Sequence, residues 1–207
     1  MAKNSFPGKF VVFEGLDGAG KTAQIKMIAD YFNGGKFGHK LQVVIEPTQL
    51  LIGGLVRSRL RGDWHSSPDA LQLLFAADRA DHLQKEIIPA LKKGMLVVGD
   101  RYSFSTIAYG AVDCDFDWLA GINSRFMIPD LTIFLNVPVD ECIRRISGER
   151  GSIELFEKAS ILKEIGGNYQ AVIEKFQNSA NIKIINGNRE KEEVFAEALA
   201  AIKELLV

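Results

Sequence analysis

Short apolar runs alternate along the chain with longer segments that have a helical pattern of apolar positions. Most of the short runs are continuously apolar instead of alternating, which is typical of parallel strands covered by helices on both faces. We therefore predict strands at Phe10–Phe13, Leu41–Ile45, Met95–Val98, Leu131–Val137 and Ile182–Ile185. The longer segments predict helices at about 21–33, 52–61, 68–93, 103–111, 116–126, 139–147, 154–178 and 190–206.

This alternation of strands and helices predicts the class of fold. It implies one parallel sheet whose strands are joined by right-handed crossovers, with helices on both faces. Ser67 before Pro68 marks a helix start, and Gly94 marks the stop before the third strand. Because no repeat, low-complexity segment or linker divides the chain, residues 1–207 are predicted to form a single α/β domain.

Composition and charge indicate which class of protein this is and which kinds of binding partner are expected. With 47% hydrophobic and 25% charged residues, the chain has the composition of an ordinary soluble globular protein. Its formal net charge of −1 gives no reason to expect nucleic acid or an anionic membrane as the main partner. Cys114 and Cys142 do not make a disulfide framework, and neither an N-terminal signal nor a membrane-length apolar run is seen. We therefore expect a reduced, cytoplasmic protein.

The loop after the first strand carries the most specific motif in the chain. It fits the phosphate-loop pattern G-x-x-x-x-G-K-[ST] and lies between a predicted strand and a predicted helix, as that motif requires. Its backbone N–H groups would wrap the phosphates of a nucleoside triphosphate, with Lys21 reaching the outer phosphates and Thr22 ligating magnesium. A glycine-rich turn alone would not explain Lys21 and Thr22 directly after the last glycine. The expected residues of the nucleoside triphosphate site are Gly15, Leu16, Asp17, Gly18, Ala19, Gly20, Lys21 and Thr22.

An acidic and a basic residue follow the third strand, at the edge where open α/β sheets bind ligands. There Asp100 would hold magnesium or orient the attacking group, and Arg101 would grip a phosphate. A strand-terminal ion pair is the alternative, but a phosphate loop on a neighbouring strand favours an active site. We therefore predict Thr22 and Asp100 as the metal ligands.

Three arginines surround glycines between two predicted helices. A mobile lid over phosphates needs arginines on a glycine-hinged loop, because they stabilise charge on a transferring phosphoryl group while closure excludes water. The alternative is a solvated basic helix end. With the phosphate loop present we favour an Arg-rich lid over about residues 144–157, which contains Arg144, Arg145 and Arg150.

One face of the predicted 68–93 helix combines aromatic and polar side chains. Phe75, Asp78, Arg79 and His82 are spaced i, i+3, i+4 and i+7, so they share a face. An aromatic ring beside an arginine suggests stacking and hydrogen bonding to a planar base. The spacing alone favours the alternative, with Phe75 in the core and the polar groups on the helix surface.

Together these motifs resemble the thymidylate kinase family. The matching pieces cover nearly the whole chain in the family's order, at residues 13–22, 74–79, 100–105, 108–109, 129–135 and 156–157. The resemblance implies a P-loop NTPase-type fold, with a five-stranded parallel sheet, helices on both faces and an Arg-rich lid. It implies transfer of the γ-phosphoryl group of ATP to dTMP, giving dTDP, with Mg²⁺ as cofactor. It also implies a homodimer.

The resemblance further implies roles for individual residues. Asp17 would approach the sugar 3′-hydroxyl of dTMP, Phe75 would stack on thymine, and Arg79 would hydrogen-bond its edge. Arg101 would hold the acceptor phosphate, and Tyr109 would lie against the deoxyribose and help to exclude a 2′-hydroxyl. Because position 18 is glycine, a lid arginine would be catalytic. The expected catalytic set is Lys21, Asp100, Arg101 and either Arg145 or Arg150.

Two positions depart from the family's pattern. The second strand usually ends in Arg-Glu-Pro, whose arginine grips the acceptor phosphate, but here Ile45 precedes Glu46 and Pro47. Arg57 in the next helix is a candidate replacement, although a solvated row of arginines is the alternative. A base-reading polar residue often follows the tyrosine, where Gly110 stands here. These departures leave open a kinase for another nucleoside monophosphate or a nucleoside, or a non-catalytic nucleotide-binding protein of this fold.

Overall fold

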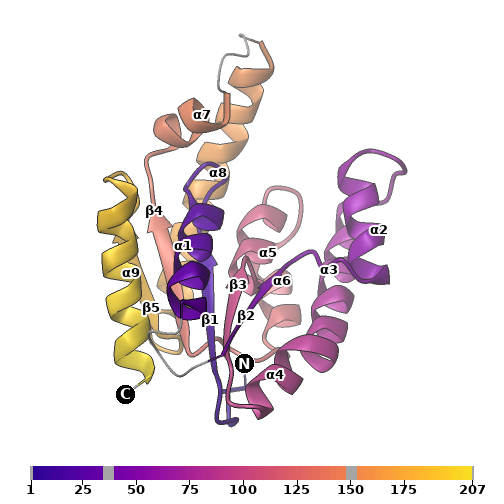
Figure 1. Cartoon of the computed structure of the whole chain (residues 1–207). Helices are drawn as coiled ribbons and strands as arrows, with labels where there is room; N and C mark the ends of the chain where they lie inside the picture. The colour runs from indigo at the N-terminus through magenta and orange to yellow at the C-terminus, as the bar shows by residue number, and fades with distance from the viewer. Residues whose placement is uncertain (1, 35–39, 148–152, 207) are drawn as a thin grey trace.

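The protein is represented by a computed structural model that describes residues 2–34, 40–147 and 153–206. Its sheet has five strands, all parallel, in the order β2-β3-β1-β4-β5 (Figure 1). They are β1 (Lys9–Glu14), β2 (Leu41–Ile45), β3 (Leu96–Asp100), β4 (Leu131–Asn136) and β5 (Ile182–Asn186). The predicted strands are confirmed, and the largest change in a boundary is in β3, which continues to Asp100.

Helices cover both faces of this sheet, as predicted. The α-helices described are α1 (Lys21–Asn33), α2 (Leu51–Leu60), α3 (Pro68–His82), α4 (Ile88–Lys92), α5 (Ser103–Gly110), α6 (Phe116–Asn123), α7 (Val139–Ser147), α8 (Ile153–Phe176) and α9 (Lys191–Leu206). α1 and α9 pack together on one face, whereas α3, α4, α5, α6 and α8 lie on the other (Figure 1). Within the described ranges, no helix combines the length and the apolar character that crossing a bilayer requires.

The predicted helix over 68–93 is interrupted by a π-helical turn, Leu83–Ile87, which joins α3 to α4. There the N–H of Ile88 donates to the carbonyl of Leu83. The next residue is Pro89, which has no N–H and whose ring clashes with a regular helix backbone, so the preceding turn widens. The apolar pattern continues through this turn and therefore does not predict it. α6 likewise ends at Asn123 instead of near 126.

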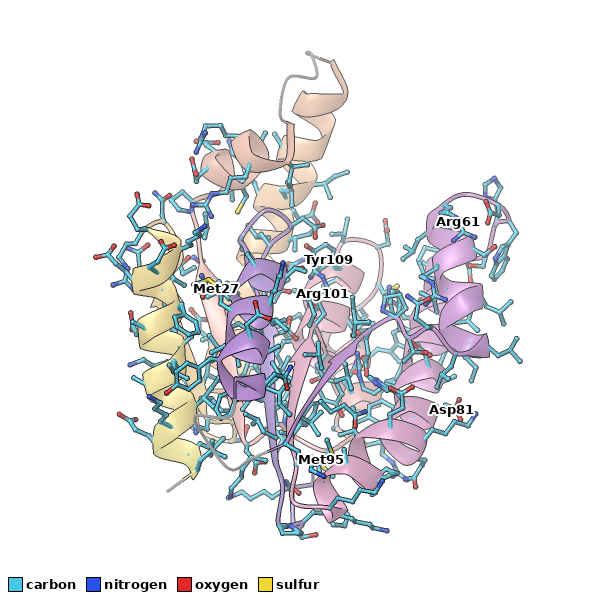
Figure 2. The ribbon with its side chains drawn as sticks, in the orientation of Figure 1. Met27, Arg61, Asp81, Met95, Arg101 and Tyr109 are labelled. Atoms are coloured by element: carbon cyan, nitrogen blue, oxygen red, sulfur yellow. The ribbon has the colours of Figure 1, made fainter. Side chains whose placement is uncertain are left out.

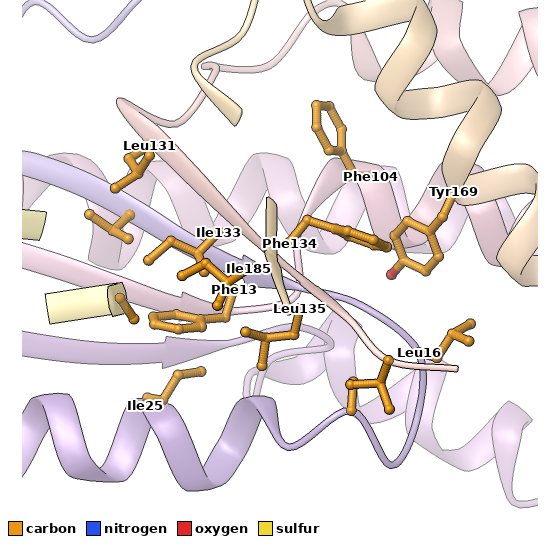
Figure 3. Packing of buried hydrophobic residues seen from close by; sticks show 14 of the residues in the cluster. Phe13, Leu16, Ile25, Phe104, Leu131, Ile133, Phe134, Leu135, Tyr169 and Ile185 are labelled. Atoms are coloured by element: carbon orange, nitrogen blue, oxygen red, sulfur yellow. The ribbon is translucent and has the colours of Figure 1, made fainter. Parts of the chain in front are cut away.

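Buried side chains fix the layers beneath the site. On the α1 face, Phe13 of β1 packs with Ile133 and Ile25 (Figure 3). On the opposite face, the ring of Phe134 lies 5.2 Å from the ring of Tyr169 on α8, measured between centroids. These residues are all less than a tenth exposed. Such burial holds the ends of the strands in place, so the loops that follow them have a rigid base.

The carboxyl ends of the strands bring the predicted site residues to one edge of the sheet. β1 lies between β3 and β4, with Phe13 in register with Asp100. The loop after β1 and the residues after β3 are therefore neighbours. α2 with the start of α3 rises above this edge on one side, and α7 with the start of α8 rises on the other (Figure 1).

Candidate active site

The loop between β1 and α1 has backbone geometry that glycine adopts readily. Gly15, Gly18 and Gly20 have φ angles of 141°, 80° and 93°, where a Cβ causes strain. A Cβ on Gly18 would also lie 2.5 Å from the carbonyl oxygen of Cys142 in α7. The loop ends at the N-terminus of α1, and backbone N–H groups in such a position bind phosphate groups.

Lys21, the first residue of α1, is only 5% exposed. Its ammonium group donates to the carbonyl oxygens of Gly15, at 3.0 Å, and Leu16, at 2.8 Å. Burial lowers the pKa of Lys21 to about 8, and the positive charge of Arg101 acts in the same direction. A bound phosphate would supply the negative charge that favours the protonated form.

Thr22 and Asp100, the predicted metal ligands, are hydrogen-bonded to one another. The hydroxyl of Thr22 donates to Oδ2 of Asp100 over 2.8 Å. Asp100 is 7% exposed and lines the same cavity as Thr22. Hydroxyl and carboxylate oxygens are the hard ligands that Mg²⁺ prefers, and it binds them together with substrate phosphates. The two side chains therefore fit a magnesium ion that arrives with a nucleotide.

Arg101 lies at the centre of the site and connects three segments. Its guanidinium group forms an ion pair with Asp17 of the phosphate loop. It also donates to the hydroxyl of Tyr109 over 3.0 Å and lies 4.7 Å from the centroid of that ring. Figure 2 shows Arg101 and Tyr109 close together at the carboxyl edge. Three of the predicted acceptor-binding residues are thus in contact.

Two adjoining cavities open at this edge. The phosphate-loop cavity has a volume of about 570 Å³ and is lined by Lys21, Thr22 and Asp100, among others. The α3–α5 cavity has a volume of about 380 Å³, and Phe75 and Tyr109 line it. The residues that line both cavities are Asp17, Glu46, Pro47 and Arg101. The cavities therefore meet where Asp17 and Arg101 form their ion pair.

The polar face of α3 is buried. Arg79 is 1% exposed and donates to the carboxylate of Glu46 over 2.9 and 2.6 Å. Thr106 and Asn123 accept two further N–H groups of the same guanidinium. His82 is also 1% exposed, and its Nδ1 lies 3.1 Å from Glu46. The interpretation that placed these groups on the helix surface is wrong, because Glu46 after β2 gives them a partner inside the protein.

Phe75 and Arg79 both line the α3–α5 cavity. Phe75 is only partly buried there. A guanidinium group has five N–H donors, and those of Arg79 make four hydrogen bonds, two to Glu46 and one each to Thr106 and Asn123. One N–H on Nη1 therefore has no partner in the described part of the chain. Because Arg79 lines the cavity, this N–H is a candidate donor to a ligand bound there.

A buried network beneath the site adds residues that the sequence patterns do not predict. Glu14, the last residue of β1, is 1% exposed and accepts from the backbone N–H groups of Tyr102, at 3.0 Å, and Ser105, at 3.2 Å. The hydroxyl of Tyr169 donates to the same carboxylate over 3.1 Å and lies 3.4 Å from Nη1 of Arg101. Burial raises the pKa of Glu14, and the hydrogen bond from the Ser105 side chain opposes that rise. The sequence contains one signal for Glu14, because it is a charged residue at the end of a mostly apolar strand.

The predicted lid is described only in part. Arg145 lines the phosphate-loop cavity, pairs with Glu141 over 2.7 Å and donates to the carbonyl of Gly187 over 3.3 Å. Arg144 pairs with the same carboxylate and is largely exposed. Arg150 lies outside the described residues. Of the two candidate catalytic arginines, Arg145 is thus the one whose position is known.

The corner after β2 holds the first departure from the family's pattern. Ile45 is 48% exposed and lines the phosphate-loop cavity. Nη1 of Arg57 donates to the carbonyl of Pro47 over 3.4 Å, and Pro47 lines both cavities. Arg57 itself lines neither of these two cavities, and its guanidinium contacts the backbone of a residue that lines both.

Comparison with known proteins gives a consistent result. A family model described as "Thymidylate kinase" matches residues 13–198, which is most of the chain. The chain belongs to the thymidylate kinase family. The "Probable thymidylate kinase" of Pyrococcus abyssi is 39% identical, over 97% of this chain and 98% of its own length. "Thymidylate kinase" proteins of Desulfotalea psychrophila and Prochlorococcus marinus are 36% and 33% identical, over 97% and 96% of this chain and 96% and 98% of their own.

The part of the chain that the family model matches includes the residues that line the two cavities. The matched residues contain the phosphate loop, the polar face of α3, the end of β3, and Arg144 and Arg145 of α7. Both cavities are lined entirely from this matched part. The resemblance inferred from the motifs is therefore confirmed.

Proposed function

We propose that this chain transfers the γ-phosphoryl group of ATP to dTMP, giving dTDP and ADP. The observation that carries the proposal is the meeting of two cavities at Asp17 and Arg101. One cavity contains a phosphate loop, and the other has an aromatic ring beside a buried arginine. A triphosphate and a planar base would each have a site, with their phosphates facing each other at the junction. In-line phosphoryl transfer needs this positioning above all.

The phosphate-loop cavity holds ATP in this proposal. The backbone N–H groups of residues 15–22 surround the phosphates, and Lys21 turns from its two carbonyl partners to the outer phosphates. Thr22 and Asp100 hold Mg²⁺, which when bound neutralises charge on the phosphate oxygens. Arg145 or Arg150 stabilises the charge that develops on the transferred group. Closure of a lid over about residues 144–157 excludes water as a competing acceptor.

The α3–α5 cavity holds dTMP. Phe75 stacks on the thymine ring, and the remaining N–H of Arg79 donates to its edge. Tyr109 lies against the deoxyribose, where its bulk leaves no room for a 2′-hydroxyl. Asp17 approaches the 3′-hydroxyl, while Arg101 holds the acceptor phosphate. This arrangement uses the base, the sugar and the phosphate of the acceptor, so each part contributes to recognition.

The acceptor phosphate needs positive charge that Ile45 does not supply. Arg57 is held 3.4 Å from the carbonyl of Pro47, at a corner shared by both cavities. We propose that it turns toward the phosphate when dTMP binds. Replacement by alanine would then raise the KM for dTMP and leave the KM for ATP unchanged. An unchanged KM for dTMP would remove Arg57 from the site.

Further proposals follow from family membership. We propose that the 207 residues act as one nucleoside monophosphate kinase domain. We also propose that the protein is a cytoplasmic homodimer whose partners are ATP and dTMP, without nucleic acid or membrane. Sedimentation at several protein concentrations tests the dimer, and a monomer at micromolar concentration would contradict it.

The test is acceptor-dependent release of ADP with Mg²⁺ and ATP, comparing dTMP, dUMP, dCMP, dAMP, dGMP, UMP and CMP. We expect dTMP to give the highest kcat/KM and Arg101→Ala to lower it by about 100-fold or more. Arg61→Ala is the matched control, because Arg61 lies exposed at the far end of α2 (Figure 2). Preference for another acceptor would support the kinase activity but contradict the assignment of dTMP as the acceptor. ATP turnover without any acceptor dependence would indicate a nucleotide switch.

A further inference from the structure

Gln72 of α3 is a buried polar residue beside the proposed base site. It lies about one turn before Phe75 and two turns before Arg79, so the three share the face that lines the α3–α5 cavity. Gln72 is 8% exposed, and its Oε1 is buried without a hydrogen-bond partner among the described residues. A buried amide oxygen in this state favours a ligand that brings a donor.

Gly110 of α5 makes room for this amide. A Cβ on Gly110 would lie 2.8 Å from Cδ and 2.9 Å from Oε1 of Gln72, which is too close for either atom. The side chain of Gln72 therefore fills the space that a side chain at position 110 would need. The amide of Gln72, from the facing helix, thus lies directly against the position that follows Tyr109.

We propose that Gln72 recognises the hydrogen-bonding edge of the thymine base. Its oxygen accepts from N3–H, and its nitrogen donates to the neighbouring O2. This inference rests on the proposed function, because it requires dTMP in the α3–α5 cavity. The remaining N–H of Arg79 donates to O4 at the other end of the same edge. Along the edge of thymine, O4, N3–H and O2 thus face a donor from Arg79, an acceptor from Gln72 and a donor from Gln72.

Cytosine does not match these two residues. It has an amino group, which donates, at position 4 and an acceptor at N3. The amino group would face the N–H of Arg79, and the oxygen of Gln72 would stay without a donor. Uracil has the same edge as thymine, so Gln72 cannot separate the two. The inferred role is therefore selection of the oxo pyrimidines against cytosine.

The substitution Gln72→Met tests this role, because it keeps the length of the side chain and removes both polar groups. The kcat/KM values for dTMP, dUMP and dCMP are measured at saturating MgATP. We expect those for dTMP and dUMP to fall together by about 10-fold or more, mainly through KM, with little change for dCMP. The dTMP-to-dCMP ratio then falls about 10-fold, while the dTMP-to-dUMP ratio stays constant. Gln84→Met, at an exposed position just after α3, is the control and should change neither ratio.

The outcomes are distinguishable. An unchanged dTMP-to-dCMP ratio overturns the proposal, and so does an equal loss for all three acceptors, which a merely structural role would cause. If the wild-type protein shows no dTMP-dependent turnover, the proposed function fails and the role of Gln72 fails with it. If Gln72→Met does not fold, Gly110→Ala provides the same test, since its Cβ displaces the amide. A wild-type ratio in Gly110→Ala would overturn the proposal.

Discussion

Binding of MgATP is expected to drive proton uptake by Lys21 in mildly alkaline solution. In the free protein burial lowers the pKa of the Lys21 ammonium group to about 8, and its hydrogen-bond partners among the described residues are two carbonyl oxygens. In the complex it would lie against phosphate oxygens, whose negative charge raises the pKa again. A group whose pKa rises on binding takes up a proton between the two values, so the ligand binds less tightly as the pH rises through that window.

The size of the effect follows from the free-protein pKa. With a pKa of about 8, about half of the molecules lack this proton at pH 8 and about one in ten lack it at pH 7. If the bound pKa returns to the ordinary value of 10.5, uptake is about 0.1 proton at pH 7, about 0.5 at pH 8 and about 0.9 at pH 9. The apparent affinity then falls by at most about tenfold for each pH unit above 8.

Titration calorimetry with Mg²⁺ and a non-hydrolysable ATP analogue measures this uptake. At each pH, the slope of the observed enthalpy against the ionisation enthalpy of the buffer gives the number of protons. Lys21→Arg is the control, because a guanidinium group keeps its proton throughout this range. If Lys21→Arg still binds the analogue, its binding should take up no proton. Uptake that is equal at pH 7 and pH 9, or that persists in Lys21→Arg, would refute the reasoning.

Three further predictions concern the metal pair, the buried ion pair and the network under the loop. Thr22→Val removes the hydroxyl that bonds Asp100, so we expect kcat to fall by about 10-fold or more and a magnesium titration to show a higher requirement. Glu46→Gln leaves the charge of Arg79 buried with a weaker partner, and should lower the free energy of unfolding in urea by about 3 kcal/mol. A loss below about 1 kcal/mol would contradict that. Tyr169→Phe should cost about 1 kcal/mol of stability and lower kcat, whereas wild-type kcat would exclude a positioning role.

The phosphate loop was predictable because its determinants are local. Gly15, Gly18 and Gly20 stand where φ is positive, and Lys21 and Thr22 follow at fixed distances along the chain. The apolar run before the loop and the helical pattern after it can also be recognised from short segments of the sequence. No distant contact is needed to infer a strand, a phosphate-binding turn and a helix in that order.

The face of α3 was not predictable in the same way. A helical period shows which side chains share a face, but not whether another segment covers that face. Arg79 is buried because Glu46, from the end of β2, approaches it across the sheet edge. Glu14 likewise depends on Tyr169 and Ser105, which come from two other helices. Such pairs become visible only when the packing of the whole domain is known.

The backbone of Arg101 supports the view that the junction of the two cavities is the functional centre. Its φ of 68° is a conformation that costs of order 1–3 kcal/mol for a residue with a Cβ. The N–H of Arg101 is nevertheless held by the carbonyl of Phe13 at 3.1 Å, and its side chain is held by Asp17 and Tyr109. This conformation directs the guanidinium across the end of β1, over the carbonyl of Gly15. A relaxed backbone would give up that position, so the strained conformation supports the proposal that Arg101 places a positive charge between the donor and acceptor phosphates.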